Sequence, residues 1–242
     1  AAGGTLCPGF IDLHIHGIHT FLVDNGPDEL AQICRILTRY GVTGFLPTVC
    51  PLPKGQDAAF LKSLALGNYT GAQILGFHLE GPFLSITGAL PPEALGQADL
   101  DRVNRLIDAA RPYKAIFSIS PEFKGITDLL AAMTADDTPA FITHTKADIA
   151  QTLEAIGAGA CHATHFYDVF YAPEMTDPGV RPCGAVEAIL ASPQVSVDFI
   201  LDGVHVDPTA VKMALQCKGK DNVCLITDAN IGAGLGAGRY QF

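Results

Sequence analysis

The sequence predicts a single α/β domain, a (β/α)8 barrel of the TIM type. Short apolar runs recur along the 242 residues, and a stretch with helical spacing separates each run from the next. This alternation is typical of a parallel sheet covered by helices. Because 48% of the residues are hydrophobic, the chain can bury a large core, and single α/β barrels commonly reach this length.

Eight runs are expected to be the barrel strands: Gly9–Leu13, Thr43–Thr48, Gln73–Leu79, Lys114–Ser118, Pro139–Thr143, Ala160–Thr164, Gln194–Leu201 and Asn222–Thr227. Seven stretches between them are expected to be helices: Asp28–Tyr40, Gln56–Leu66, Asp99–Ala110, Ile126–Thr134, Asp148–Ile156, Cys183–Ala191 and Pro208–Cys217. Asp28, Asp148 and Asp207 are the expected N-caps, because a carboxylate accepts the free N–H groups of a first turn. The sequence thus predicts one barrel domain, residues 1–242, that lacks its last helix and is incomplete at both ends.

Composition narrows the class of protein. The formal net charge of −10 disfavours nucleic acid and anionic membranes as partners. The seven cysteines form no Cys-x-x-Cys pair, which predicts a reduced, cytoplasmic protein with buried thiols. No apolar run is long enough to span a membrane and no signal-peptide pattern opens the chain, so a soluble protein is expected.

Glu80 lies in the stretch that best predicts chemistry, Gly76-Phe-His-Leu-Glu-Gly-Pro-Phe83. A carboxylate between an apolar run and a Gly-Pro turn lies where a barrel strand reaches its C-terminal mouth. The period-two alternation of a strand places His78 on the same face as Glu80. Glu80 is therefore a candidate metal ligand.

Two more histidines lie in phase on the first strand. His14 and His16 are two residues apart, so both point to one face near the mouth. Two imidazoles held in this way suit a metal ion better than two unrelated polar residues would.

Three further strand ends carry similar residues. His144 ends the fifth expected strand, His165 the sixth and Asp228 the eighth. Such convergence on one barrel mouth predicts a single site. Nitrogen and oxygen ligands without cysteine suit zinc or another divalent first-row metal in a catalytic centre.

The remaining polar residues near the strand ends support weaker predictions. His205 follows the seventh strand and is interpreted as a substrate contact, with a supporting hydrogen bond or a surface position as alternatives. His162 has the opposite strand parity to His165, and His19 lies in a loop, so both are expected to be structural. Glu122 follows the fourth strand and could reach the mouth or remain a solvated loop residue.

Other chemistries explain these residues less well. The sequence contains no Gly-x-Ser-x-Gly turn of a serine hydrolase, and no Gly-x-Gly-x-x-Gly follows the first strand to bind a dinucleotide. Paired carboxylates for glycoside cleavage would leave the histidines unexplained.

Five motifs together resemble those of the N-acetylglucosamine-6-phosphate deacetylases of the amidohydrolase superfamily. They occur in order over essentially the whole chain: Pro8-Gly-Phe-Ile-Asp-x-His-x-His-Gly17, Gly76-x-His-Leu-Glu-Gly-Pro82, Ala163-Thr-His165, Asp202-Gly-x-His-Val206 and Leu225-x-Thr-Asp228. The resemblance implies the barrel of the metal-dependent amidohydrolases, without the family's flanking β-sandwich, its last barrel helix and its C-terminal segment.

The resemblance also implies roles for individual residues. Glu80, His144 and His165 match the ligands of the family's main metal site, and His14 and His16 match positions that supply a second metal in some relatives. The expected metal is zinc, with iron, cobalt, manganese or nickel as alternatives, and one or two ions.

Three other positions match residues that act on the substrate. His205 matches the residue that polarises the acetamide carbonyl, and Asp228 matches the general acid and base. Arg181 matches an arginine that reaches the sugar phosphate across a dimer interface. A homodimer is therefore expected.

The sequence departs from the family near the phosphate. Where the family has Thr-His-Leu-Phe-Asn-Ala-Met, this chain has Thr164-His-Phe-Tyr-Asp-Val-Phe170. Asp168 replaces an asparagine, and both Asp168 and Val169 are expected at the substrate. A carboxylate repels a phosphate unless it is protonated or bridged. Leu90 replaces a histidine that contacts the substrate, and the longer stretch before Arg181 puts the reach of that residue in question.

The expected function is metal-dependent removal of the acetyl group from an acetamido sugar, first of all N-acetylglucosamine 6-phosphate. In this mechanism the metal activates a water molecule, Asp228 moves its proton, and His205 polarises the carbonyl. Two alternatives stay open. One is an amidohydrolase for another N-acyl or cyclic amide, and the other is a non-catalytic metal-binding fragment of the fold.

Overall fold

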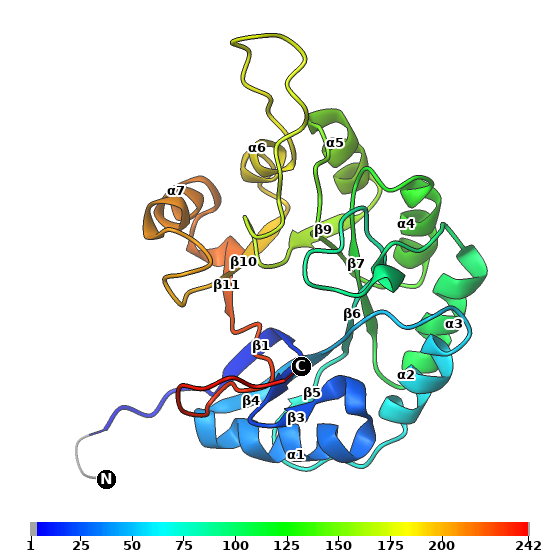
Figure 1. Ribbon diagram of the computed structural model, residues 1–242, viewed down its shortest axis with the longest axis vertical. Coiled ribbons are helices and arrows are strands. Elements are labelled where there is room, and N and C mark those ends of the chain that lie inside the picture. Colours follow the sequence, from blue (N-terminus) through cyan, green and yellow to red (C-terminus); the bar gives the residue numbers. More distant parts are fainter. Residues whose placement is uncertain (1–3, 242) are drawn as a thin grey trace.

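Eight parallel strands lie side by side in chain order in the computed structural model, which describes residues 4–241 (Figure 1). They are β1 (Phe10–Ile15), β4 (Val42–Val49), β6 (Phe77–Phe83), β7 (Ala115–Ile119), β8 (Ala140–Ile142), β9 (Ala160–Ala163), β10 (Ser196–Ile200) and β11 (Val223–Ile226). The short β5 (Gln73–Ile74) pairs with β4, and β2 (Gly17–Ile18) forms a small antiparallel pair with β3 (Phe21–Leu22). The predicted barrel architecture is confirmed.

Within residues 4–241, seven α-helices lie outside the strands (Figure 1). They are α1 (Pro27–Leu37), α2 (Asp57–Ala65), α3 (Leu100–Ala110), α4 (Ile126–Ala135), α5 (Ile149–Gly157), α6 (Ala185–Ala191) and α7 (Pro208–Lys218). Four 3-10 turns complete the regular elements: η1 (Val23–Asn25), η2 (Thr38–Tyr40), η3 (Pro92–Ala94) and η4 (Lys220–Asn222). All seven predicted helices are present.

Two of the three predicted N-caps are confirmed. Asp148 accepts the N–H of Gln151 at the start of α5, and Asp207 accepts the N–H of Thr209 at the start of α7. The prediction for Asp28 is wrong, because α1 begins one residue earlier, at Pro27. A proline at the first helical position has the required φ and no N–H to satisfy, so a side-chain cap is less needed there.

The core has two layers. Large aromatic side chains such as Phe45, Phe117 and Phe199 fill the space between the strands and the helices. Leu46, Ile116 and Phe141 come from β4, β7 and β8 and form a separate cluster. Since β4 and β8 are not neighbours in the sheet, these three side chains meet inside the barrel.

The barrel closes between β1 and β11 at the mouth. Asp228 donates its N–H to the carbonyl of His14 at 3.1 Å, and His16 donates to the carbonyl of Ala229 at 2.8 Å. Below them, the hydroxyl of Thr227 donates to the carboxylate of Asp12 at 2.6 Å. This junction holds His14 on β1, and His16 directly after β1, close to Asp228.

The cysteines only partly match their prediction. All seven are free thiols, but Cys7, Cys161, Cys183 and Cys217 are exposed and only Cys34 is fully buried. The expectation of buried thiols is therefore wrong for most of them. None of the helices in residues 4–241 is long and apolar enough to cross a membrane.

Candidate metal centre

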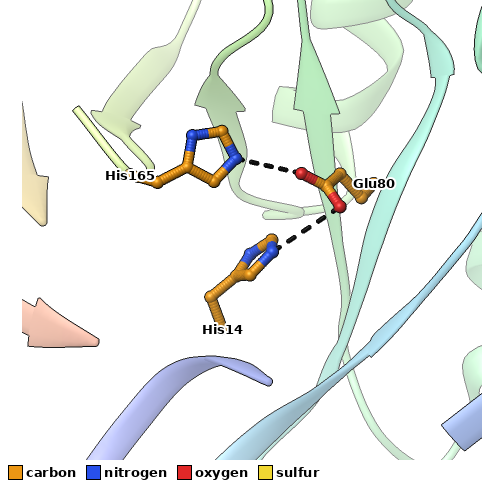
Figure 2. Close-up of side chains that lie close together, drawn as sticks. All are labelled: His14, Glu80 and His165. Atoms are coloured by element: carbon orange, nitrogen blue, oxygen red, sulfur yellow. Dashed lines mark hydrogen bonds and ion pairs between the residues drawn. The ribbon is translucent and has the colours of Figure 1, made fainter. Parts of the chain in front are cut away.

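The carboxylate of Glu80, on β6, lies among four imidazoles. Figure 2 shows it between two of them, those of His14 and His165. Its Oε1 is 3.0 Å from Nε2 of His165 and 3.4 Å from Nε2 of His144. Its Oε2 is 3.1 Å from Nε2 of His16 and 3.6 Å from Nε2 of His14. The structure therefore brings together at one mouth the five residues that the sequence predicted as metal ligands.

Asp228 lies beside two of these histidines, His14 and His16. Its Oδ1 is 3.5 Å from Nε2 of His14 and 3.7 Å from Nε2 of His16. The carboxyl group is more exposed than that of Glu80, because Asp228 also lines the cavity above the centre. It thus faces both the imidazoles and the space that a substrate would enter.

The donor set fits a divalent cation. Ligand atoms of His14, Glu80 and His165 lie within 4.8 Å of one another, and the same holds for His14, His16 and Asp228. Nε2 of His14 is buried and has no hydrogen-bond partner among residues 4–241, which is costly unless a ligand satisfies it. Nitrogen and carboxylate oxygen are donors that zinc and related metals accept.

Charge inside the centre supports the same conclusion. Burial alone would raise the pKa of Glu80, but the charge of His14 and the hydrogen bonds from the histidines hold it well below its usual range. Burial lowers the pKa of His165, yet the hydrogen bond and charge of Glu80 reverse this and raise it to about 9. The pKa of His16 is likewise raised against the effect of burial, by Cys50 and Glu80. The carboxylate of Glu80 thus favours positive charge beside it, whether on protonated imidazoles or on a bound cation.

Three residues of the site have unusual backbones. His144, His165 and Asp228 each lie just after a strand. Their φ angles are 48°, 35° and 47°, in the left-handed region that non-glycine residues rarely adopt. Such strain is concentrated at functional sites, where surrounding contacts maintain it. Here the hydroxyl of Ser120 donates to the carbonyl of His144 at 2.8 Å, and Asp198 accepts the N–H of His165.

A hydrogen bond to a backbone carbonyl orients His144. Its Nδ1 donates to the carbonyl of Ile86 at 3.0 Å. This bond leaves the lone pair on Nε2, the nitrogen that faces Glu80. A metal-binding histidine typically has its other nitrogen held in this way.

His78 lies below the centre rather than in it. It shares a strand face with Glu80 as predicted, and its Nδ1 is 3.2 Å from Nδ1 of His14. Its Nε2 is 2.9 Å from the hydroxyl of Ser118, and burial lowers its pKa to about 3. His78 is therefore a neutral support for His14.

Asp198 was missed by sequence reasoning. It lies inside the barrel on β10, where it accepts hydrogen bonds from Nε2 of His162 at 2.8 Å and from the hydroxyl of Thr164 at 3.1 Å. The signal that could have found it is a carboxylate between two apolar residues of a buried strand, Val197 and Phe199. Its contacts agree with the structural role predicted for His162.

A cavity of about 320 Å³ opens above the centre. His205 lines it, and its Nδ1 is 2.7 Å from Oδ2 of Asp202, which leaves Nε2 as the nitrogen available to a ligand. Asp168, Val169 and Leu90 also line it. Oδ2 of Asp168 is buried without a partner, and burial raises the pKa of this carboxyl group.

Other predicted residues lie outside the cavity. The guanidinium of Arg181 is largely exposed and pairs with Glu187 on α6, beside a separate pocket. Glu122 is bound in a loop by the hydroxyl of Thr145 and the N–H of Lys146, so the possibility that it reaches the mouth is not borne out.

The structure adds two residues that sequence reasoning did not single out. Cys50 follows β4, and its Sγ is 3.5 Å from Nδ1 of His16. Asp24, in η1, accepts the N–H of Cys50 at 3.0 Å. Burial raises the pKa of the Cys50 thiol to about 11, although His16 partly opposes this. The position of Cys50 at a strand end was the available signal.

Comparison with known proteins finds relatives along the whole chain. The N-acetylgalactosamine-6-phosphate deacetylase of Escherichia coli O157:H7 is 32% identical over 241 residues, which are 97% of this chain and 62% of that protein. The N-acetylglucosamine-6-phosphate deacetylase of Bacillus subtilis is 32% identical over 250 residues, covering all of this chain and 62% of its own length. No family model matches the chain.

Solved structures of the same kind share the fold. The N-acetyl-D-glucosamine-6-phosphate deacetylase of Mycobacterium smegmatis aligns with a TM-score of 0.86 and 30% identity, over 97% of this chain and 61% of that one. A D267A mutant of that protein, with the same scores, was solved in complex with N-acetyl-D-glucosamine-6-phosphate. The chain thus spans about three-fifths of the length of the relatives it matches. The resemblance predicted from the motifs is confirmed, because over nearly its whole length this chain is similar in sequence and in fold to N-acetylglucosamine-6-phosphate deacetylases.

Proposed function

We propose that this protein removes the acetyl group from an N-acetylated amino sugar, with N-acetylglucosamine 6-phosphate as the first substrate. The observation that carries the proposal is the buried Glu80 among four imidazoles, with Asp228 and His205 at the edge of the same cavity. The relatives named as deacetylases support the choice of an acetamido sugar. The reaction cleaves the amide C–N bond and yields acetate and the free amine.

Glu80, His144 and His165 would hold the main divalent cation, and His14 and His16 a second ion. Zinc is the proposed metal, because neutral imidazoles and a carboxylate suit it in a catalytic centre. A bound ion of this kind lowers the pKa of water from 15.7 towards about 7, which supplies hydroxide at neutral pH.

Asp228 is the proposed proton carrier. It lies at the cavity wall within 3.5 Å of an imidazole of the centre, so it can accept a proton from a water molecule placed there. The same carboxyl group can then protonate the leaving nitrogen, because that atom is released into the same space. The hydrogen bond from the N–H of Asp228 to the carbonyl of His14 helps to maintain the left-handed backbone of Asp228, and so the position of its carboxylate.

His205 is proposed to polarise the acetamide carbonyl. Asp202 holds Nδ1 and accepts the backbone N–H of His205 at 3.0 Å, which fixes the ring at the cavity wall. In the imidazolium form both ring nitrogens carry protons, so Nδ1 donates to Asp202 while Nε2 can donate to the carbonyl oxygen as negative charge develops on it.

The sugar would lie towards Asp168 and Val169, which line the cavity away from the centre. Arg181 would bind a phosphate only from a second subunit, because in its own subunit it faces Glu187 outside the cavity. The proposal therefore includes a homodimer. A cytoplasmic place is proposed from the free thiols.

A second candidate substrate is the same acetamido sugar without its phosphate. Among the described residues that line the cavity, none is lysine or arginine, and Asp168 offers an unpaired carboxylate oxygen. Such an oxygen favours a hydroxyl donor over a phosphate.

Acetate release tests both candidates. The chain would be reconstituted with zinc and incubated with N-acetylglucosamine and N-acetylgalactosamine, each with and without the 6-phosphate. We expect acetate from at least one of the four, and none from Asp228→Asn under the same conditions. Absence of acetate from all four sugars, with metal present in the protein, would contradict the proposed function.

A further inference from the structure

His16 has two ring nitrogens in different surroundings. Nε2 lies 3.1 Å from Oε2 of Glu80, within the centre described above. Nδ1 lies 3.5 Å from Sγ of Cys50. The proposed function uses the first nitrogen and leaves the second, together with the thiol beside it, without a role.

Asp24 completes a second group of ligand atoms around this nitrogen. Its Oδ1 accepts the N–H of Cys50, so the carboxylate is held next to the thiol. One ligand atom from each of His16, Asp24 and Cys50 lies within 4.8 Å of the other two. The three residues come from the end of β1, from η1 and from the end of β4, so the fold alone brings them together.

We propose that His16, Asp24 and Cys50 form an additional site for a thiophilic divalent cation, zinc or cadmium, beside the Glu80 centre. One nitrogen, one oxygen and one sulfur ligand leave the fourth position of a tetrahedral ion open to water. Both His16 and Cys50 line the mouth cavity, which provides a path for the ion.

Distance and charge fit such an ion. Tetrahedral zinc with bonds of about 2.0–2.1 Å to nitrogen and about 2.3 Å to sulfur separates the two ligand atoms by about 3.6 Å. The structure has 3.5 Å between Nδ1 and Sγ. On binding, a metal–sulfur bond forms and the thiol proton passes to water, so the thiolate and the carboxylate of Asp24 balance the two positive charges.

The shared histidine couples the two sites. A neutral imidazole has one nitrogen with a free lone pair, and its other nitrogen carries the proton. His16 therefore serves either the Glu80 centre through Nε2 or the additional site through Nδ1. An excess of a thiophilic metal should draw His16 away from the Glu80 centre.

Cobalt(II) is the probe that separates a metal site from a simple S–H···N hydrogen bond, which would have a similar length. The metal-free chain would be titrated with cobalt, and the near-ultraviolet thiolate-to-cobalt band recorded together with the number of ions bound. We expect the band in the wild type. Cys50→Ser should lose the band and bind one cobalt ion fewer, and Asp24→Asn should bind cobalt at this site at least tenfold more weakly. Cys217→Ser, which changes an exposed thiol on α7, is the matched control and should keep the band.

An equal band and equal cobalt content in the wild type and Cys50→Ser would overturn the proposal. Loss of the band in Cys217→Ser instead of Cys50→Ser would do the same, because the thiolate would then lie on the surface. Since no substrate is present, these outcomes are independent of acetate release, and the additional site can fail while the proposed function holds.

Discussion

Glu80→Gln removes the charge of the centre while keeping nearly the same volume. The pKa of His165 is about 9, against an ordinary 6.5, although burial acts to lower it and Glu80 is the main group that raises it. Each pKa unit corresponds to about 1.4 kcal/mol, so the carboxylate stabilises the protonated imidazole by about 3 kcal/mol or more. This is a factor of at least about 10² in proton binding, and a divalent cation in the same place should lose at least as much.

We therefore expect Glu80→Gln to lose its metal and, in the metal-free protein, to lower the pKa of His165 below 6.5. Elemental analysis measures the first effect, and an NMR titration of the imidazole measures the second. Glu122→Gln is the matched control, because that carboxylate also follows a barrel strand but is bound to Thr145 in a loop. Equal metal content and an unchanged pKa in Glu80→Gln would refute the assignment of Glu80 to the centre.

Four other predictions follow from the same geometry. Asp228→Asn should lower kcat by about 10²- to 10⁴-fold while the metal stays bound, and retained kcat in a folded variant would place the proton carrier elsewhere. If two ions bind to the Glu80 centre, elemental analysis should give one metal ion per chain fewer in His14→Ala than in the wild type. The preference for phosphate is the kcat/KM of the 6-phosphorylated sugar divided by that of the unphosphorylated sugar. This preference should fall in Arg181→Ala and rise in Asp168→Asn, and an unchanged value in both variants would exclude the two residues from phosphate recognition. Burial acts to raise the pKa of Asp198, but the neighbouring histidines outweigh this effect and the pKa is lowered overall. The ionised carboxylate therefore stabilises the fold above about pH 4, and this stabilisation is lost as the pH falls below that. Urea unfolding at pH 5 and pH 3 should show a smaller loss of unfolding free energy in Asp198→Asn than in the wild type.

The positions of the strand ends could be read from the sequence. Apolar runs alternate with helical stretches, and the carboxyl ends of parallel strands all meet at one mouth, so the sequence alone predicts that Glu80, His144 and His165 lie together. The in-phase pair His14 and His16 followed from the period of a strand. Local rules were sufficient for these residues because each depends only on its own strand.

Contacts between strands that are distant in the sequence depended on the tertiary structure. Asp198 beside His165, and Cys50 beside His16, are set by register and by the closure of the barrel, which no local pattern encodes. The place of Arg181 depended in the same way on the path of a long loop, which leaves its guanidinium on Glu187 instead of in the cavity. The sequence by itself determined which groups reach the mouth, while the tertiary structure decided which of them touch, because side-chain contacts across a barrel depend on how the strands are staggered around it.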